Sequence, residues 1–190
     1  MLSASSAPAT RARVFFALWP DAACATRLHA IAAACAADCG GRVMQKDTLH
    51  LTLAFVDDVD AGELPALCAI AEAAGVALQP RPPHALLLDR IGYWPQKRIL
   101  WAASEQPPAV LEALAKRLAG GLREAGHRLP LRPFAPHVTL LRKVGAVPPA
   151  PRMDILHDAP QPWHFDRFCL LRSRPSASGA AYETLAAWPL

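Results

Sequence analysis

The sequence lacks the features that mark membrane proteins and disulfide-stabilised proteins. No stretch approaches the roughly 18 uncharged apolar residues that a membrane span needs, and the N-terminal segment has neither a long apolar run nor a clear cleavage site for secretion. The five cysteines form no CxxC pair and no spacing that suits a zinc ribbon or a disulfide framework; they are Cys24, Cys35, Cys39, Cys68 and Cys169. These absences exclude a membrane protein and predict a cytoplasmic protein whose cysteines are reduced, small core residues.

The motifs of nucleotide-dependent enzymes and of serine hydrolases are also missing. There is no P-loop, no G-x-G-x-x-G turn and no G-x-S-x-G elbow. Two of the seven histidines, His50 and His137, belong to the repeated motif described below, and the others show no metal-ligand spacing to it; they are His29, His84, His127, His157 and His164. We therefore expect neither a metal nor a cofactor.

What the chain does have is enough apolar sequence for one sizeable core. Of its 190 residues, 53% are hydrophobic and 19% are charged, which is typical of a globular domain and not of a disordered chain. We expect a flexible N-terminal tail at residues 1–12 and one domain at residues 13–190.

The charge balance is mildly basic and rich in arginine. Twenty Lys and Arg residues stand against 16 Asp and Glu residues, giving a net charge of +4, and 16 of the 20 cations are Arg. The guanidinium fork can bind phosphate through two hydrogen bonds, so this bias suits a phosphate-bearing partner. Genome composition alone explains the same bias, and both explanations stay open.

The order of the expected elements indicates an α+β protein with helices on the outer faces of mostly antiparallel sheets. Helices are indicated by an N-cap at Asp21 with a stop at Gly40, by the capping-box spacing of Asp60 and Glu63, and by Pro107-Pro108 as a first turn. A Pro-rich connector is expected at residues 147–162. Strands are expected at residues 14–18, from about 49, at 84–91 and 98–103 as a hairpin, and at 137–141, 165–172 and 182–187.

One short motif occurs twice, as His50-Leu51-Thr52-Leu53 and as His137-Val138-Thr139-Leu140. Because side chains alternate along a strand, each copy should present a histidine and a threonine on one face, while Leu51, Leu53 and Phe55 should point into the core. A single His-x-Thr in a strand is most often an ordinary sheet segment. Two copies in opposite halves of the chain favour one shared site in a cleft.

Two histidines that face one small anion suit acid and base chemistry on a phosphoester at neutral pH. Imidazole titrates near about 6.5, so one ring can take a proton from water while the other gives one to the leaving oxygen. Two threonine hydroxyls can donate hydrogen bonds to the phosphate oxygens without adding charge. This set of residues requires no metal.

These residues resemble the 2H phosphoesterases, and among them the RNA 2′,3′-cyclic phosphodiesterases, historically called 2′-5′ RNA ligases. The resemblance is carried by the doubled motif and by the segments at residues 13–18, 49–55, 98–101 and 132–142. It implies a two-lobed fold with antiparallel sheets related by a pseudo-twofold axis, helices on the outer faces and a central cleft. It also implies metal-independent opening of terminal 2′,3′-cyclic phosphates to 2′-phosphates, with reversible 2′-5′ ligation in some members.

By this resemblance His50 would be the proton donor and His137 the proton acceptor, with Thr52 and Thr139 holding the phosphate. Arg142 matches a family cation that binds the phosphate, although strict alternation places it on the face opposite His137 unless the strand bends near Leu141. Residues considered for stacking on a base are Tyr93, Trp94 and Phe134. Residues considered for following a phosphate backbone are Arg128, Arg132, Lys143, Arg172 and Arg174.

The expected partner is an RNA or oligonucleotide with a 2′,3′-cyclic phosphate end, with no membrane partner, and we expect a monomer. Two alternatives stay open at this point. One is a related enzyme that acts on a small cyclic nucleotide or a similar metabolite. The other is an RNA-binding module that keeps the fold without turnover, although both His-x-Thr pairs are present.

Overall fold

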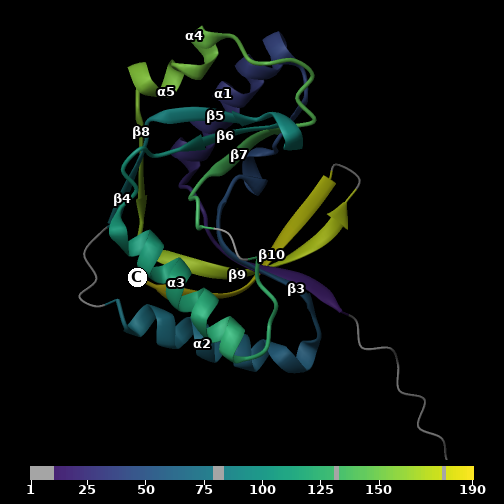
Figure 1. Cartoon of the computed structure of the whole chain (residues 1–190), viewed down its shortest axis with the longest axis vertical. Coiled ribbons are helices and arrows are strands. Elements are labelled where there is room, and N and C mark those ends of the chain that lie inside the picture. The colour runs from purple at the N-terminus through teal and green to yellow at the C-terminus, as the bar shows by residue number, and fades with distance from the viewer. Residues whose placement is uncertain (1–10, 79–83, 131–132, 177–178) are drawn as a thin grey trace, which may run out of the picture.

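The computed structural model describes residues 11–78, 84–130, 133–176 and 179–190 (Figure 1). Its strands are β1 (Ala12–Leu18), β2 (Arg42–Val43), β3 (Leu51–Val59), β4 (His84–Leu88), β5 (Arg90–Trp94), β6 (Ile99–Ala103), β7 (Val138–Arg142), β8 (Gln161–Phe165), β9 (Arg167–Ser176) and β10 (Gly179–Pro189). Its helices are α1 (Ala22–Cys39), α2 (Leu64–Val76), α3 (Ala109–Glu124), α4 (Ala150–Met153) and α5 (Ile155–Asp158). Of the predicted tail at residues 1–12, residues 1–10 lie outside the described residues, and β1 begins at Ala12.

One antiparallel sheet runs through two lobes. Its strand order is β10-β9-β1-β3-β7-β6-β5, with β2 beside β7. The strands β10, β9, β1 and β3 form one lobe with α2 and α3. The other strands of this sheet, β7, β6, β5 and β2, form the second lobe with α1, α4 and α5 (Figure 1). Within the described part of the sheet, β3 and β7 pair across the two lobes at one residue pair, Leu51 with Val138. A two-stranded ribbon of β4 and β8 lies beside both lobes.

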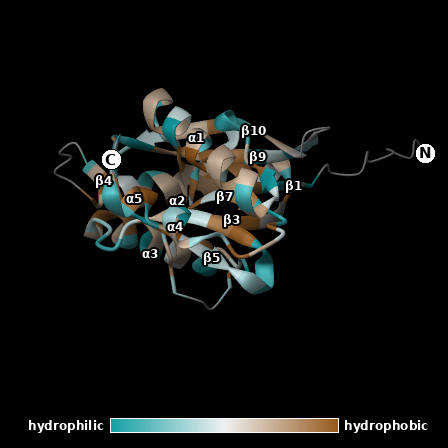
Figure 2. Cartoon of the chain, turned by 90° about the horizontal axis from the view of Figure 1, so that it is seen from above, coloured by the Kyte–Doolittle hydropathy of each residue, from teal (hydrophilic) through white to brown (hydrophobic). Residues whose placement is uncertain are grey.

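Apolar side chains from both lobes form one continuous core. On β1, Val14, Phe16 and Leu18 point into this core, and the alternating residues Phe15 and Ala17 point to the opposite face of the sheet. Figure 2 shows the apolar segments of β3 and its neighbouring strands inside the molecule, with hydrophilic segments around them. The expected α+β arrangement, with helices covering the outer faces of antiparallel strands, is therefore present.

Two of the predicted helix starts have the expected capping groups. The Asp21 carboxylate accepts a hydrogen bond from the Cys24 amide at 2.8 Å and begins α1. At the second start, Asp60 and Glu63 form the reciprocal capping box, each with a 2.8 Å hydrogen bond. That box caps the short 3₁₀ turn Ala61–Glu63, so α2 begins one turn later than predicted, at Leu64.

The third helix also begins later than the sequence suggested. α3 starts at Ala109, so both prolines precede its first turn. Its inward face is formed by leucines spaced three or four residues apart; they are Leu111, Leu114, Leu118 and Leu122. At Gly121 a Cβ would press against Ile70 of α2, so this glycine lets the two helices pack closely. α2 and α3 together cover the outer face of their lobe.

The predicted hairpin at residues 84–103 was partly wrong. β4 ends at Leu88 and pairs with β8, which begins at the end of the expected connector, so the strand that pairs with β6 in the hairpin is β5 and not β4. Gly92 is not part of the turn but lies within β5. The indole of Trp101 covers this residue and leaves no room for a Cβ, which explains why the strand has a glycine there. The turn is confined to Pro95–Lys97 and is closed by Arg98 in a left-handed conformation.

Among the helices that the structure describes, none has the length and apolar character needed to cross a membrane.

Candidate active site

His50 and His137 each lie one residue before a strand. His50 precedes β3 and His137 precedes β7, so the prediction that both lie inside strands was wrong by one position. Thr52 and Thr139 are the second residues of the two strands. All four side chains are partly exposed and line the same cleft.

The pairing of β3 with β7 explains how the two copies meet. Leu51 and Val138, the middle residues of the two His-x-Thr triplets, are antiparallel partners and fully buried. Continuing that register by one residue in each direction sets His50 against Thr139 and Thr52 against His137. The histidine of each copy is thus beside the threonine of the other, as a twofold relation between the copies requires.

Each histidine is oriented by the same backbone hydrogen bond. Nδ1 of His50 lies 2.7 Å from the carbonyl oxygen of Thr48, and Nδ1 of His137 lies 2.7 Å from the carbonyl oxygen of Ala135. A carbonyl oxygen can only accept, so Nδ1 carries the hydrogen in both rings. Nε2 is therefore the atom that exchanges protons in each imidazole.

A β-bulge follows each His-x-Thr triplet at the same position. In the pairing of β1 with β3, Phe16 lies opposite Ala54 and Ala17 lies opposite Thr52, which leaves Leu53 without a partner. In the pairing of β6 with β7, Leu140 is left out in the same way. An unpaired residue shifts the alternation of side chains by one position. The residues beyond each bulge consequently change face.

The two bulges correct the predictions for Phe55 and Arg142. Phe55 was expected in the core, but it lies opposite Phe15 on the site face, lines the cleft and is 41% exposed. Arg142 lies opposite Ile99 and also lines the cleft. The alternation that seemed to turn Arg142 away from His137 is thus reset at Leu140, and Arg142 shares the face of Thr139.

Aromatic side chains enclose His50. Its ring centroid lies 5.0 Å from Phe15, 5.0 Å from Tyr182 and 5.9 Å from Trp19, with the last two edge-on. The pKa of His50 is lowered to about 4, mainly by burial; the hydrogen bond to Thr48 opposes this shift, and the positive charges of Arg142 and a protonated His137 add to it. His50 is therefore neutral at pH 7 in the ligand-free protein.

His137 has a less enclosed environment. Its ring meets one indole edge-on, that of Trp94, at a centroid distance of 4.7 Å. The ammonium of Lys97 lies 5.0 Å from the centroid of the same indole. The second histidine thus faces the cleft beside a wall that carries positive charge.

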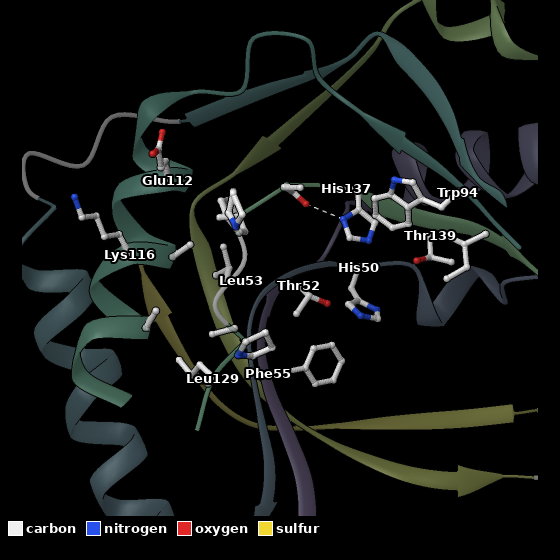
Figure 3. Close-up of a pocket in the computed structure, with 18 of the residues that line it drawn as sticks. His50, Thr52, Leu53, Phe55, Trp94, Glu112, Lys116, Leu129, His137 and Thr139 are labelled. Atoms are coloured by element: carbon white, nitrogen blue, oxygen red, sulfur yellow. Dashed lines mark hydrogen bonds between the residues drawn. The ribbon is translucent and has the colours of Figure 1, made fainter. Parts of the chain in front are cut away.

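These groups share one cleft of about 760 Å³. Figure 3 shows His50, Thr52, His137 and Thr139 grouped together, with Phe55 beyond Thr52 and Trp94 beside His137. The cleft continues past Leu53 to the helix that carries Glu112 and Lys116. All five residues predicted to act on the phosphate, including Arg142, lie on its wall.

The other sequence candidates divide into those that reach the cleft and those that do not. Trp94 and Phe134 line it. Tyr93 instead packs against the main core, because alternation along β5 turns it away from Trp94. Arg128 and Lys143 are exposed but are not among the residues of the cleft wall. Arg132 lies outside the described residues.

Arg172 and Arg174 lie elsewhere on the molecule. Both line a separate groove at the far end of β1 and β9, and both lie near the carboxylate of Glu183, at 3.8 and 2.7 Å. These two arginines therefore do not line the cleft, and their part in following a phosphate backbone stays a prediction. Position on a basic strand alone did not indicate which way these side chains face.

Several cleft residues were not found from the sequence. Tyr182 comes from β10, which lies far along the chain and reaches His50 only through the pairing of β9 with β1. Lys97 and one face of α3 also line the wall. A signal for α3 exists, since Glu112, Lys116 and Arg123 recur on one side of a helix whose opposite side carries the leucines.

No group of three or more His, Cys, Asp and Glu side chains within the described ranges is arranged to hold a metal ion. Among the described residues of the cleft, the polar groups include two imidazoles, the hydroxyls of Thr52, Thr139 and Tyr182, several cationic groups and the carboxylate of Glu112. Such a set suits an anion better than a cation.

Comparison with known proteins gives consistent results. The family model described as the 2′-5′ RNA ligase superfamily matches residues 9–176. An RNA 2′,3′-cyclic phosphodiesterase of Escherichia coli is 41% identical over 102 residues, covering 54% of this chain and 55% of the relative. One of Thermus thermophilus is 30% identical over 158 residues, covering 77% of this chain and 74% of the relative.

Not every relative is matched over its full length. An RNA 2′,3′-cyclic phosphodiesterase of Geobacillus stearothermophilus is 31% identical over 152 residues, which cover 77% of this chain and 47% of that protein. The chain thus spans about half the length of the curated relatives from E. coli and G. stearothermophilus.

Solved structures confirm the fold. The crystal structure of E. coli LigT in complex with 3′-AMP superposes with a TM-score of 0.82 at 30% identity, covering 95% of this chain and 99% of that one. A crystal structure from Thermus thermophilus superposes with a TM-score of 0.74 at 28% identity, covering 94% and 97%. With a family model that matches most of its length, the chain belongs to the 2′-5′ RNA ligase superfamily.

Proposed function

We propose that this protein hydrolyses the terminal 2′,3′-cyclic phosphate of RNA or oligonucleotides to a 2′-phosphate, without a metal ion. The observation that carries the proposal is the pair of imidazoles on adjoining strands, each with Nδ1 bound to a carbonyl at 2.7 Å and Nε2 left to exchange protons. The names of the relatives, RNA 2′,3′-cyclic phosphodiesterases, support the same substrate class.

The proposed reaction is one displacement at phosphorus. Nε2 of His137 accepts a proton from the attacking water as the new P–O bond forms. The bond from phosphorus to O3′ breaks, and Nε2 of His50 donates the proton that the leaving O3′ needs. The products are a free 3′-hydroxyl and a 2′-phosphate. With a ribose 5′-hydroxyl in place of water, the same steps form a 2′-5′ linkage.

The phosphate-binding groups act on the charge that develops during this displacement. The hydroxyls of Thr52 and Thr139 donate hydrogen bonds to the non-bridging oxygens, and Arg142 supplies a planar, charged fork. The bound phosphate is an anion, so it raises the pKa of His50 from its low ligand-free value and lets the ring carry the proton that it donates. His50 thus becomes an acid only when substrate is present.

Exposed aromatic surface beside the phosphate site suits a nucleobase. Phe55, Trp94 and Phe134 line the cleft, and Phe55 is held from below by Phe15 at a ring distance of 5.2 Å. Stacking on such rings is the usual way in which proteins hold single-stranded RNA bases. In this proposal Phe55 replaces Tyr93 among the candidate stacking residues.

The test is turnover of a short RNA that ends in a 2′,3′-cyclic phosphate, with the position of the product phosphate determined after treatment with EDTA. We expect the 2′-phosphate and an unchanged rate. Loss of activity on chelation with recovery on adding zinc or manganese would contradict the metal-free reaction. Absence of turnover with tight RNA binding would instead support a non-catalytic RNA-binding module.

A cytoplasmic location and a monomeric state belong to the same proposal. All five cysteines are free thiols, and burial raises the pKa of Cys24 to about 12 and that of Cys35 to about 11, so these thiols suit a reducing compartment and an inert core. Light scattering on the purified protein should give the mass of one chain, and a dimer mass would contradict the monomer.

A further inference from the structure

One wall of the cleft is formed by a helix that takes no part in the proposed reaction. Five residues of α3 line the cleft, at spacings that place them on one side of the helix; they are Glu112, Ala115, Lys116, Ala119 and Arg123. From Glu112 to Arg123 this face extends about 16 Å along the helix axis. Figure 3 shows Glu112 and Lys116 on the side of Leu53 away from His50 and His137.

The composition of this arm of the cleft suits a single strand of nucleic acid. The small side chains of Ala115 and Ala119 leave space between the two cations, Lys116 and Arg123, which are exposed to solvent. The same cleft is also lined by apolar residues; they are Leu129, Pro130, Pro133 and Phe134. Cations and apolar surface within one cleft are what a phosphodiester backbone and its bases require.

The charged residues of the whole cleft also favour an anionic ligand such as a nucleic-acid strand. Among the described residues on its wall, Lys97, Lys116, Arg123 and Arg142 are cationic and Glu112 is acidic. One cation, Arg142, is already assigned to the terminal phosphate. Lys116 and Arg123 line the cleft from α3, whereas Arg142 lines it from β7, so the two α3 cations can meet a second phosphate.

We propose that the α3 arm, defined by Ala115, Lys116, Ala119 and Arg123, binds the phosphodiester that precedes the terminal cyclic phosphate. The inference rests on the proposed function of the same cleft and names its substrate class. The protein then acts faster on oligonucleotides than on cyclic mononucleotides, because only the former carry a phosphate for Lys116 and Arg123.

The test compares two substrates across three proteins. The substrates are adenosine 2′,3′-cyclic monophosphate and the dinucleotide ApA ending in a 2′,3′-cyclic phosphate. The proteins are the wild type, the double variant Lys116→Ala with Arg123→Ala, and the control Arg117→Ala. Arg117 is an exposed arginine of the same helix that is not among the residues of the cleft wall. All substituted side chains are exposed, so circular dichroism should report the same fold for each protein.

We expect the double variant to lose about five- to tenfold in kcat/KM on the dinucleotide and nothing on the mononucleotide. The salt dependence of dinucleotide binding should become flatter by about 1.4 in its logarithmic slope, since two phosphate contacts on a single strand are lost. The control should match the wild type on both substrates.

The outcomes separate this inference from the proposed function. If the wild type hydrolyses both substrates and the double variant behaves like the control on each, the α3 arm does not bind the preceding phosphate. An equal loss on both substrates would also overturn the inference, because the cations would then serve the terminal nucleotide. If the wild type hydrolyses neither substrate, the proposed function fails, and this inference fails with it.

Discussion

The two halves of the site share a backbone and differ in their surroundings. Around His50 and around His137, the backbone repeats a 2.7 Å hydrogen bond to the carbonyl two residues earlier and a β-bulge three residues later. The rings that face them differ, since three aromatic side chains enclose His50 and one indole meets His137. The same backbone arrangement thus places two imidazoles in different surroundings, and burial lowers the pKa of the first of them, His50.

The same contrast holds five residues after each histidine. There the first copy carries Phe55 and the second carries Arg142, and the bulges turn both toward the cleft. An aromatic ring and a guanidinium at equivalent positions suit a base on one side and a phosphate on the other. In the proposed function, the two equivalent positions would thus bind different parts of one ligand.

The largest expected effect comes from removing either imidazole. His50→Ala and His137→Ala should each lower kcat by about 10² to 10⁴-fold, the usual contribution of a positioned proton transfer. The double variant should be far less than additively worse, because the two rings act in one reaction. Steady-state kinetics on one cyclic-phosphate RNA, with circular dichroism to confirm folding, measures this. Full activity in either single variant would show that the histidine of that His-x-Thr motif has a structural role and no role in proton transfer.

The next effect concerns stability and tests the enclosure of His50 alone. Its folded pKa of about 4 lies below the ordinary 6.5, so between these values the unfolded chain binds a proton that the folded protein does not. Stability should therefore fall as the pH drops from 6.5 to 4, by about 3 kcal/mol from this group. Urea unfolding of wild type and His50→Gln at pH 7.5 and 4.5 measures the difference between them. The same pH dependence in both proteins would contradict the depressed pKa.

A smaller effect is expected from the residues five positions after each histidine, Phe55 in the first copy and Arg142 in the second. Arg142→Lys keeps the charge but loses the two-pronged geometry, so kcat/KM should fall by about ten- to a hundredfold. Phe55→Leu keeps an apolar side chain but loses the flat ring, and should mainly raise KM. Kinetics of both variants on one RNA substrate checks the contrast. Identical changes of KM and kcat in the two variants would contradict the proposal that Phe55 binds a base and Arg142 binds the phosphate.

The smallest effect should be the same in both halves. Thr52→Val and Thr139→Val keep the shape of the side chain and its preference for strands, and remove one hydroxyl each. We expect about a tenfold loss in kcat for each, since both hydroxyls bind the phosphate more tightly as charge develops. Wild-type kinetics in both variants would end their assignment to the phosphate. A loss in only one would show that the twofold relation does not extend to phosphate binding.

Much of this architecture could be predicted from local sequence. Asp21 and the pair Asp60 and Glu63 specify helix starts through hydrogen bonds within a few residues, and the repeated His-x-Thr triplet specifies which faces of two strands matter. These features depend on short-range chemistry and on alternation. For the same reason the two His-x-Thr pairs could be predicted to share one site from the sequence, whereas Arg142 entered only through the resemblance to the 2H phosphoesterases.

The remainder depends on contacts between distant segments. The bulges at Leu53 and Leu140 arise from pairing with β1 and β6, so alternation alone placed Phe55 in the core and left the face of Arg142 open. Tyr182 reaches His50 through two successive strand pairings. Gly92 looked like a turn residue, and only the indole of Trp101 explains why a strand residue there has no side chain.

The most direct test of the acid and base assignment uses a cyclic substrate in which sulfur replaces the leaving O3′. A thiolate leaves without being protonated, because its pKa lies far below that of an alcohol. The account predicts that sulfur restores most of the rate lost in His50→Ala and none of the rate lost in His137→Ala. Restoration in His137→Ala but not in His50→Ala would reverse the two roles, and restoration in neither would contradict proton donation to the leaving group.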